Sequence, residues 1–286
     1  AYIDQLARSR FNVLDLHGGY DLQTTGFPNL YPLLVHVPDY PNVGDAEQQQ
    51  RNLADFRAIV SYARQRGMRV AFMNYSVRGL APRGEPLADY TAKAVAALLR
   101  QVPELSMLGF RIGETGQKPD FFQRAYLHGV ALSGRNDVRL YTRSWLTTQD
   151  QLEAIGQAAG GDFDIEIKYN GEQLGLPYQA IGKGGRSYSY EGYVKTGAPY
   201  RIIWQVRADG THRFWAWAGA EFIRRAVHSF TFGRARGFTL EPYIAYFPIK
   251  AATYYRSPAD QNVYRYIWQK YWMWDFLWGR LSYNPD

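Results

Sequence analysis

Residues 87–116, LADYTAKAVAALLRQVPELSMLGFRIGETG, contain the pattern that decides the fold. Apolar residues recur with a helical period over 87–103, and the pattern stops at a proline, as helices commonly do. A short apolar run, 107–113, then reads as a buried strand. Glu114 follows it between Gly113 and Gly116. A helix that leads into a buried strand, which itself ends in a polar turn, is typical of a repeated α/β unit.

The same alternation of helix and strand extends in both directions along the chain. We predict helices over 46–67, 87–103, 119–134, 147–161 and 219–233, and strands over 12–18, 33–37, 69–75, 107–113, 138–145, 163–170, 201–208 and 238–244. Eight strands joined by helices predict an α/β fold, a (β/α)8 TIM barrel, as a single domain over 1–286. A run over 262–281 reads as an aromatic helix, which we expect to pack in the core.

Composition narrows the classes of partner. The 286 residues are 46% hydrophobic and 16% aromatic, enough for a large core, and the net charge of +7 favours an anionic partner. No run of five basic residues occurs, which argues against nucleic acid. There is no cysteine and no apolar stretch long enough for a membrane span. The abrupt ends suggest a segment cut from a longer protein or a mature secreted fragment.

Strand periodicity indicates which side chains face the interior of the barrel. In FDIEIKYN, 163–170, the apolar residues should face the helices, so Asp164, Glu166 and Lys168 should face inward. The same alternation predicts further inward-facing polar residues: Asp15, His17, Arg111, Arg139, Arg143, Gln205, Arg207, Thr239 and Glu241. Ionisable groups inside a barrel are costly unless they pair, hydrate or bind a ligand, and barrel enzymes carry their sites at the carboxyl ends of the strands.

Two carboxylates occupy that position in the sequence. Glu114 follows the strand 107–113, and Glu172 follows a turn after the strand 163–170. A salt bridge to Arg111 is the structural alternative for Glu114, and a solvated loop residue is the alternative for Glu172. Glu166 and Glu241 lie deeper, where an ion pair is the default interpretation.

Two carboxylates across a pocket are the minimum machinery for hydrolysing a glycosidic bond. The 23 tyrosines and 8 tryptophans offer stacking platforms for sugar rings. The five histidines form no HxH or HExxH motif, and no Walker, GxGxxG or GxSxG motif is present. We therefore expect neither a metal nor a nucleotide cofactor.

Three segments resemble the microbial xylan α-glucuronidases: 102–119, VPELSMLGFRIGETGQKP; 163–177, FDIEIKYNGEQLGLP; and 276–286, FLWGRLSYNPD. The resemblance implies that Glu114 is the general acid, that Lys168 matches a lysine of the family, and that Glu172 approximately matches an acid that activates water. In the family a later strand supplies a second water-activating glutamate. This chain has Gln205 and Val206 in the corresponding IWQVR, so the resemblance implies a barrel glycosidase more securely than it implies xylan as substrate.

These observations lead to one functional hypothesis. We expect a glycoside hydrolase that cleaves a uronic-acid-containing or anionic glycan, with Glu114 as general acid and Glu172 as general base. Arg111 and Lys168 would bind the sugar carboxylate, since arginine can grip it with two hydrogen bonds. The resemblance favours inversion. The other expected substrate-binding residues are Arg143, His17, Asp15, Gln205, Glu241 and Glu166.

Two alternatives remain open. A noncatalytic glycan-binding barrel would retain affinity without product. A polysaccharide lyase would use a tyrosine or histidine base beside arginine or lysine, and the tyrosine-rich stretch 178–193 is compatible with it. In each case the partner is an oligo- or polysaccharide and not nucleic acid or a membrane, and we expect a periplasmic or secreted location. The oligomeric state stays open.

Overall fold

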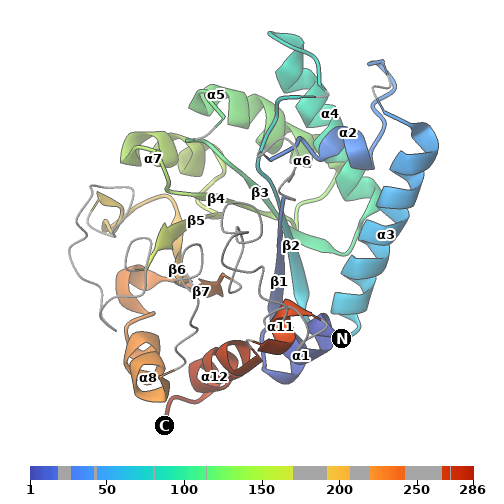
Figure 1. Ribbon diagram of the computed structural model, residues 1–286. Coiled ribbons are helices and arrows are strands. Elements are labelled where there is room, and N and C mark those ends of the chain that lie inside the picture. Colours follow the sequence, from blue (N-terminus) through green and yellow to red (C-terminus); the bar gives the residue numbers. More distant parts are fainter. Residues whose placement is uncertain are drawn as a thin grey trace, which may run out of the picture. The chain divides into compact units, whose positions relative to one another are not determined.

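The computed structural model describes residues 1–286 apart from 19–26, 42–43, 80, 114, 170–191, 207–218, 242–265 and 271. The chain divides into two compact units. The larger contains Asn12–Ile165 and Gly197–Arg201, and the smaller contains Ala1–Phe11, Glu166–Thr196 and Ile202–Asp286. The described residues form seven strands, which follow one another in the sheet in chain order (Figure 1).

Four parallel strands form the framework of the larger unit. They are β1 (Val13–His17), β2 (Arg69–Asn74), β3 (Leu105–Phe110) and β4 (Arg139–Arg143), and β5 (Phe163–Lys168) begins in the same unit. The register pairs His17 with Met73, Met73 with Gly109, and Gly109 with Tyr141. Parallel pairing confirms the prediction of an α/β fold.

Helices follow these strands, as the sequence predicts. They are α2 (Tyr31–Leu34), α3 (Ala46–Arg64), α4 (Pro86–Gln101), α5 (Pro119–Phe122), the π-helical turn η1 (Gln123–Leu127), α6 (His128–Ser133) and α7 (Gln149–Ala158). Asp45 caps α3 through the backbone N–H groups of Glu47 and Gln48, and Thr148 caps α7 in a capping box with Gln151. In Figure 1, α3, α4 and α6 lie on the outer side of β1–β4.

Aromatic side chains fill the space between these strands and helices. Phe72 of β2 meets Phe56 of α3 edge to face at 5.1 Å between ring centroids. Phe110 of β3 lies 4.9 Å from Phe122 and 4.7 Å from Tyr126. These ring contacts show that Phe72 and Phe110 point from the sheet toward the helices.

The predicted strand over 33–37 is wrong. Residues Tyr31–Leu34 form the short helix α2, and only Val35 onward is extended. Pro32 occupies the first turn of α2, where its fixed φ favours a helix and its missing N–H costs nothing. Burial of Tyr31, Leu34 and Val35 explains the apolar pattern that imitated a strand.

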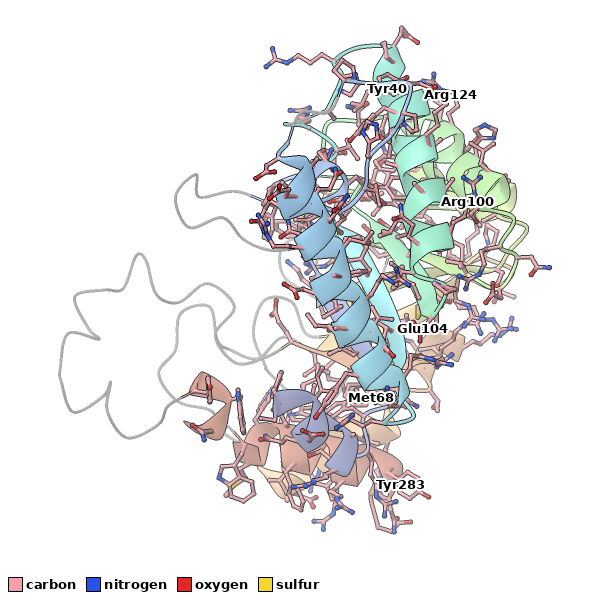
Figure 2. The ribbon with its side chains drawn as sticks, turned by 90° about the vertical axis from the view of Figure 1, so that its right-hand side faces the viewer. Tyr40, Met68, Arg100, Glu104, Arg124 and Tyr283 are labelled. Atoms are coloured by element: carbon pink, nitrogen blue, oxygen red, sulfur yellow. The ribbon has the colours of Figure 1, made fainter. Side chains whose placement is uncertain are left out.

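The outer surface of the larger unit is charged. Lys93 on α4 pairs with Asp39 and Asp89, and the Tyr40 hydroxyl donates to Asp89. Figure 2 shows Tyr40 and Arg124 near the start of α4 and Arg100 near its end. Exposed pairs of this kind add little to stability because solvent screens them, so packing beneath them stabilises the helices. Across the described part of the chain, every helix is too short or too polar to cross a bilayer.

The smaller unit is built from both ends of the chain. It contains α1 (Tyr2–Arg8), most of β6 (Arg201–Val206), β7 (Gly237–Leu240), α8 (Ala220–His228), the 3-10 turn η5 (Phe232–Arg234), α11 (Ile267–Lys270) and α12 (Trp272–Tyr283). Strands β6 and β7 are parallel, with Gln205 opposite Thr239. Trp278 of α12 is fully buried, and its ring centroid lies 6.0 Å from that of Phe230 and 5.8 Å from that of Phe238. These contacts confirm the predicted packing of this helix in the core.

Helix α12 also packs closely against the end of α1. A Cβ atom added to Gly279 would lie 1.9 Å from the carbonyl oxygen of Ser9, so only glycine fits there. One turn earlier, the Asp275 carboxyl is 5% exposed and accepts a hydrogen bond from Gln5 at 3.4 Å. Burial raises the pKa of Asp275 to about 7, and a hydrogen bond from Tyr2 opposes that rise.

Replacing Asp275 with asparagine is expected to stabilise the protein at pH 8 more than at pH 5. The folded pKa of Asp275 lies above the unfolded value, so the folded state binds the proton more tightly and loses stability as pH rises from about 4 to about 7. Between pH 5 and pH 8 that loss is on the order of 3 kcal/mol, about two pH units at about 1.36 kcal/mol each, and asparagine removes it. Urea unfolding at both pH values measures it. Glu221→Gln, an exposed change on α8, is the control, and an equal effect of Asp275→Asn at both pH values would contradict the prediction.

Candidate functional site

The register of β1–β4 lines up polar side chains on one face of the sheet. Asn74 of β2 pairs with Phe110 of β3, which pairs with Thr142 of β4. The next residues along the three strands are Tyr75, Arg111 and Arg143, so these share a row at the carboxyl ends. His17, Met73, Gly109 and Tyr141 form the row two residues earlier, on the same face because side chains alternate with period two.

The hydroxyl of Tyr75 is the meeting point of this row. It accepts hydrogen bonds from Nη1 of Arg143 at 2.6 Å and from Nη1 of Arg111 at 3.4 Å. The guanidinium carbon of Arg111 also lies 4.7 Å from the centre of the Tyr75 ring. Arg111 is 2% exposed, Arg143 5% and Tyr75 7%. Two buried cations are thus held within hydrogen-bond distance of one oxygen.

A second set of contacts connects β1 and β4 with the Tyr75 hydroxyl. Nδ1 of His17 lies 3.3 Å from the Tyr75 hydroxyl, and its Nε2 lies 2.8 Å from Oδ2 of Asp15. The Tyr141 hydroxyl donates to Oδ1 of Asp15 at 2.6 Å. The side chains of His17 and Asp15 are 28% and 17% exposed, so this part of the cluster reaches solvent. We call Asp15, His17, Tyr75, Arg111, Tyr141 and Arg143 the arginine–tyrosine cluster.

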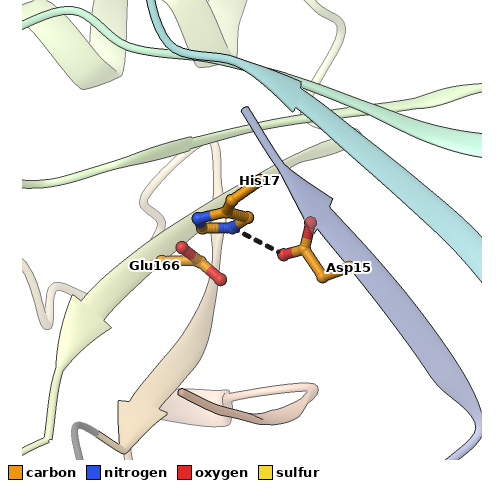
Figure 3. Close-up of side chains that lie close together, drawn as sticks. All are labelled: Asp15, His17 and Glu166. Carbon is orange, nitrogen blue, oxygen red and sulfur yellow. Dashed lines mark hydrogen bonds and ion pairs between the residues drawn. The ribbon is translucent and has the colours of Figure 1, made fainter. Parts of the chain in front are cut away.

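Figure 3 shows the His17 ring facing the Asp15 carboxylate on β1, with their hydrogen bond dashed. Carboxylate and imidazole are ligand types that bind divalent metals. In this structure Asp15 and His17 are hydrogen-bonded within the arginine–tyrosine cluster, and these bonds orient the His17 imidazole. The third side chain labelled in Figure 3, Glu166, belongs to the smaller unit.

Gly109 makes the cluster possible. A Cβ atom at this position would lie 2.7 Å from two atoms of the Tyr141 ring and 2.9 Å from Cβ of Met73. Because Gly109 has no side chain, the Tyr141 ring lies against β3, and its hydroxyl reaches Asp15 on β1. A larger residue would push the ring away from Asp15.

The structure therefore brings together four of the predicted substrate-binding residues: Asp15, His17, Arg111 and Arg143. The predicted shared face of these four is confirmed by the strand register. Tyr75 and Tyr141 were not predicted. Tyr75 is the last residue of the predicted strand 69–75, and its polar hydroxyl directly after a buried strand is the signal that could have identified it.

Arg139 and Asp164 have a structural role. Arg139 Nε lies 3.2 Å from Asp162 and 3.6 Å from the fully buried Asp164. Paired burial is the ordinary way to accommodate a carboxylate in a protein interior. This pair accounts for two of the inward-facing charges that the sequence predicts.

Four other predicted binding residues lie in the smaller unit. Glu166 and Lys168 of β5 are buried, and Gln205 of β6 is buried while its carbonyl accepts from the N–H of Tyr169. Glu241 follows β7 and is half-buried, with its N–H donating to the carbonyl of Val206. The strand bounds place Glu166 and Lys168 within β5 and Gln205 within β6, as predicted. Glu241 directly follows the last residue of β7, whereas the sequence predicts it within the strand 238–244.

The predicted catalytic pair, Glu114 and Glu172, lies outside the described residues. The residues on both sides of position 114 are fixed by close packing at Gly113 and by hydrogen bonds at Thr115. A Cβ atom at Gly113 would lie 2.1 Å from the carbonyl oxygen of Trp145, and the buried Thr115 donates from N and Oγ1 to the carbonyl of Ile112. The loop after β3 thus packs directly on the loop after β4.

Chemically, the arginine–tyrosine cluster suits an anionic ligand. Arginine presents its donors in a planar fork that matches carboxylate, and fixed donors in a buried site act more strongly than in water. The cluster lies at the carboxyl ends of adjacent parallel strands, where α/β folds bind their ligands.

No protein-family model and no curated protein matches the chain. Among solved structures, it is similar to a GH138 enzyme targeting pectin rhamnogalacturonan II, with a TM-score of 0.75 and 20% identity over 100% of this chain and 34% of that one. A glucosidase from Croceicoccus marinus has a TM-score of 0.54 and 10% identity, covering 83% and 55% of the two chains. A Bacteroidetes-affiliated GH5 cellulase linked with a polysaccharide utilization locus has a TM-score of 0.50 and 10% identity, covering 84% and 74%. The chain spans about a third of the length of the GH138 enzyme and about half that of the glucosidase. At these identities the likeness establishes the fold, one that glycosidases use.

Proposed function

We propose that this chain is the catalytic barrel of a glycoside hydrolase that acts on a uronic-acid-containing glycan. The observation that carries the proposal is the convergence of Arg111 and Arg143 on Tyr75 at the carboxyl ends of parallel strands. A pair of buried guanidinium groups there suits the carboxylate that distinguishes a uronic acid from a neutral sugar. The fold, shared with a GH138 enzyme that targets a pectin, supports the same reading.

In this proposal Glu114 is the general acid and Glu172 the general base. Position 114 directly follows Gly113 in the loop after β3, beside Arg111 in sequence. A closed (β/α)8 barrel would bring the loops after β3 and β5 to one opening. Inversion, which the α-glucuronidase resemblance favours, needs about 6.5–9.5 Å between the two carboxyl groups so that water fits, whereas retention needs about 5–5.5 Å.

The remaining residues take binding roles. Lys168 would add a point charge to the arginine pair at the sugar carboxylate. Gln205, Glu166 and Glu241 would hydrogen-bond sugar hydroxyls. A substrate of this class implies a periplasmic or secreted enzyme.

Incubation of the purified protein with acidic and neutral glycans tests the proposal. We expect release of free uronic acid from a uronosyl-containing oligosaccharide, with the initial anomer resolved by NMR, and no release from the matching neutral oligosaccharide. Affinity for the acidic glycan without product would support a noncatalytic binding barrel. An ultraviolet-absorbing, unsaturated product would indicate a lyase. Either result would overturn hydrolysis.

A further inference from the structure

Helix α12 of the smaller unit has a buried face and an exposed aromatic face. Trp274 and Trp278 are buried in the core of the unit. Figure 1 shows α12 between α8 and α1, and it contacts both helices. Other residues of α12 leave large apolar side chains in water: Trp272 is 49% exposed and Phe276 38%, and Met273 is exposed beside them. Large apolar residues gathered on one exposed surface commonly mark a binding surface.

Helical spacing joins exposed residues of α12 into one strip. Trp272, Phe276 and Arg280 follow one another at intervals of four residues, and Tyr283 comes one turn later, so all four lie on one side of the helix. The ring centroids of Trp272 and Phe276 are 6.0 Å apart, and the guanidinium carbon of Arg280 lies 5.4 Å from the centre of the Phe276 ring. Tyr283, labelled in Figure 2, is 70% exposed, and the guanidinium carbon of Arg10 lies 4.1 Å from its ring centre. We call these five residues the α12 strip.

The α12 strip is positively charged. Neither Arg10 nor Arg280 forms an ion pair or a side-chain hydrogen bond with any residue that the structure describes, and Nε of Arg280 is buried without such a partner. The only acid of α12, Asp275, is buried. The strip therefore presents two guanidinium groups beside aromatic rings, with no carboxylate of its own helix exposed next to them.

We propose that the α12 strip is a noncatalytic binding surface for an acidic polysaccharide, built from residues other than those of the arginine–tyrosine cluster. This inference rests on the proposed function, which supplies the class of glycan. Trp272 and Phe276 offer apolar faces on which sugar rings can stack, and Arg10 and Arg280 offer donors and charge to uronate carboxylates. From Trp272 to Tyr283 the helix rises about 16 Å, which suits a chain of sugars better than a single one.

Charge favours this occupant over a second copy of the chain. The chain carries a net charge of +7, and two strips paired about a two-fold axis would bring two guanidinium groups from each copy into one interface. An anionic lipid surface is also less suited. Helices that lie on membranes separate an apolar face from a charged face, whereas Arg280 lies among the aromatic rings of the strip.

Affinity electrophoresis in gels that contain polygalacturonate tests the inference, with fully methyl-esterified polygalacturonate as the neutral form of the same polymer. We expect the acidic polymer to bind more tightly, and its advantage to shrink at about 1 M salt, where charges are screened beyond about 3 Å. Trp272→Ala combined with Phe276→Ala should weaken binding of both polymers about 5- to 10-fold, because it removes the aromatic anchors. Arg10→Gln combined with Arg280→Gln should weaken binding of the acidic polymer alone, about 3- to 10-fold.

Tyr62→Ala combined with Arg66→Gln is the matched control. These residues lie on the surface of the larger unit, where the guanidinium carbon of Arg66 is 3.2 Å from the centre of the Tyr62 ring. The control removes the same kinds of side chain from another surface and should leave binding of both polymers unchanged. Urea unfolding shows that each variant is folded.

The inference is overturned if the unchanged protein does not bind polygalacturonate, or if the folded Trp272→Ala, Phe276→Ala variant binds it undiminished. An equal loss for both polymers in the arginine variant would also overturn it. Strip-dependent binding to phosphatidylglycerol vesicles, or a dimer that Trp272→Ala dissociates, would assign the strip to a lipid surface or to a second copy if polymer binding is absent.

Kinetics on a short soluble uronoside separate this inference from the proposed function. The α12 strip variants should leave kcat and KM on that substrate within about twofold, because they lie outside the proposed catalytic and binding residues. Hydrolysis of the uronoside without strip-dependent polymer binding would defeat only the binding surface. Strip-dependent polymer binding without hydrolysis of any glycan would defeat only the hydrolase.

Discussion

Glu114→Gln should lower kcat about 10²- to 10⁴-fold on a natural uronoside, because the amide has the shape of the acid but cannot protonate the leaving oxygen. The effect should shrink on an aryl uronoside whose phenolate leaves without a proton, since the general acid is then little needed. Steady-state kinetics on the two substrates measures the difference. This comparison tests the role of Glu114 more sharply than loss of activity alone.

Glu104→Gln is the control for this prediction. Glu104, labelled in Figure 2, carries the same functional group and lies exposed just before β3, at the opposite end of that strand from Arg111. It should leave kcat within about twofold. Near-normal kcat for folded Glu114→Gln on the natural substrate would remove Glu114 from the mechanism, and an equal loss on both substrates would argue against acid catalysis.

Gly279→Ala should destabilise the protein by about 3 kcal/mol or more. The added methyl group would lie 1.9 Å from the carbonyl oxygen of Ser9 and 3.1 Å from Cε2 of Phe11, so α12 must move away from the end of α1. Helix propensity alone predicts the opposite sign, since alanine is better than glycine inside a helix by about 1 kcal/mol. Urea unfolding decides between them.

Ser282→Ala serves as the control, because this residue lies on the same helix one turn later and its hydroxyl bonds only to the carbonyl of Gly279 among the contacts described. Its cost should be about 1 kcal/mol or less. A stabilised Gly279→Ala variant would mean that α12 does not pack on Ser9 as closely as the structure shows.

Much of the fold could be predicted because its signals are local. The apolar period of 46–67 and 87–103 predicts α3 and α4, and the caps at Asp45 and Thr148 sit where the helices start. The prediction of a strand over 33–37 was wrong because so short an apolar run does not distinguish a strand from a buried helix. Pro32 lies in the first turn of α2, a position that proline favours.

The candidate site could be predicted only in part. Period two correctly placed Asp15, His17, Arg111 and Arg143 on one face, since the side-chain alternation of a strand follows from its backbone. It could not predict that Tyr75 joins the two arginines, because that contact depends on how β2, β3 and β4 are staggered. Stagger is a property of the pairing between strands.

Gly109 and Tyr141 show most clearly the difference between what the sequence predicts and what only the tertiary structure decides. Composition, charge and local periodicity were sufficient for a basic, cysteine-free α/β chain of parallel strands with ionisable residues on one sheet face, because each of these depends on neighbouring residues. The bond from Tyr141 to Asp15 joins residues 126 positions apart. It reaches across β2 and β3, and the missing side chain at Gly109 of β3 leaves room for the Tyr141 ring. Such a contact arises from three-dimensional packing across strands, and no local pattern in the chain encodes it.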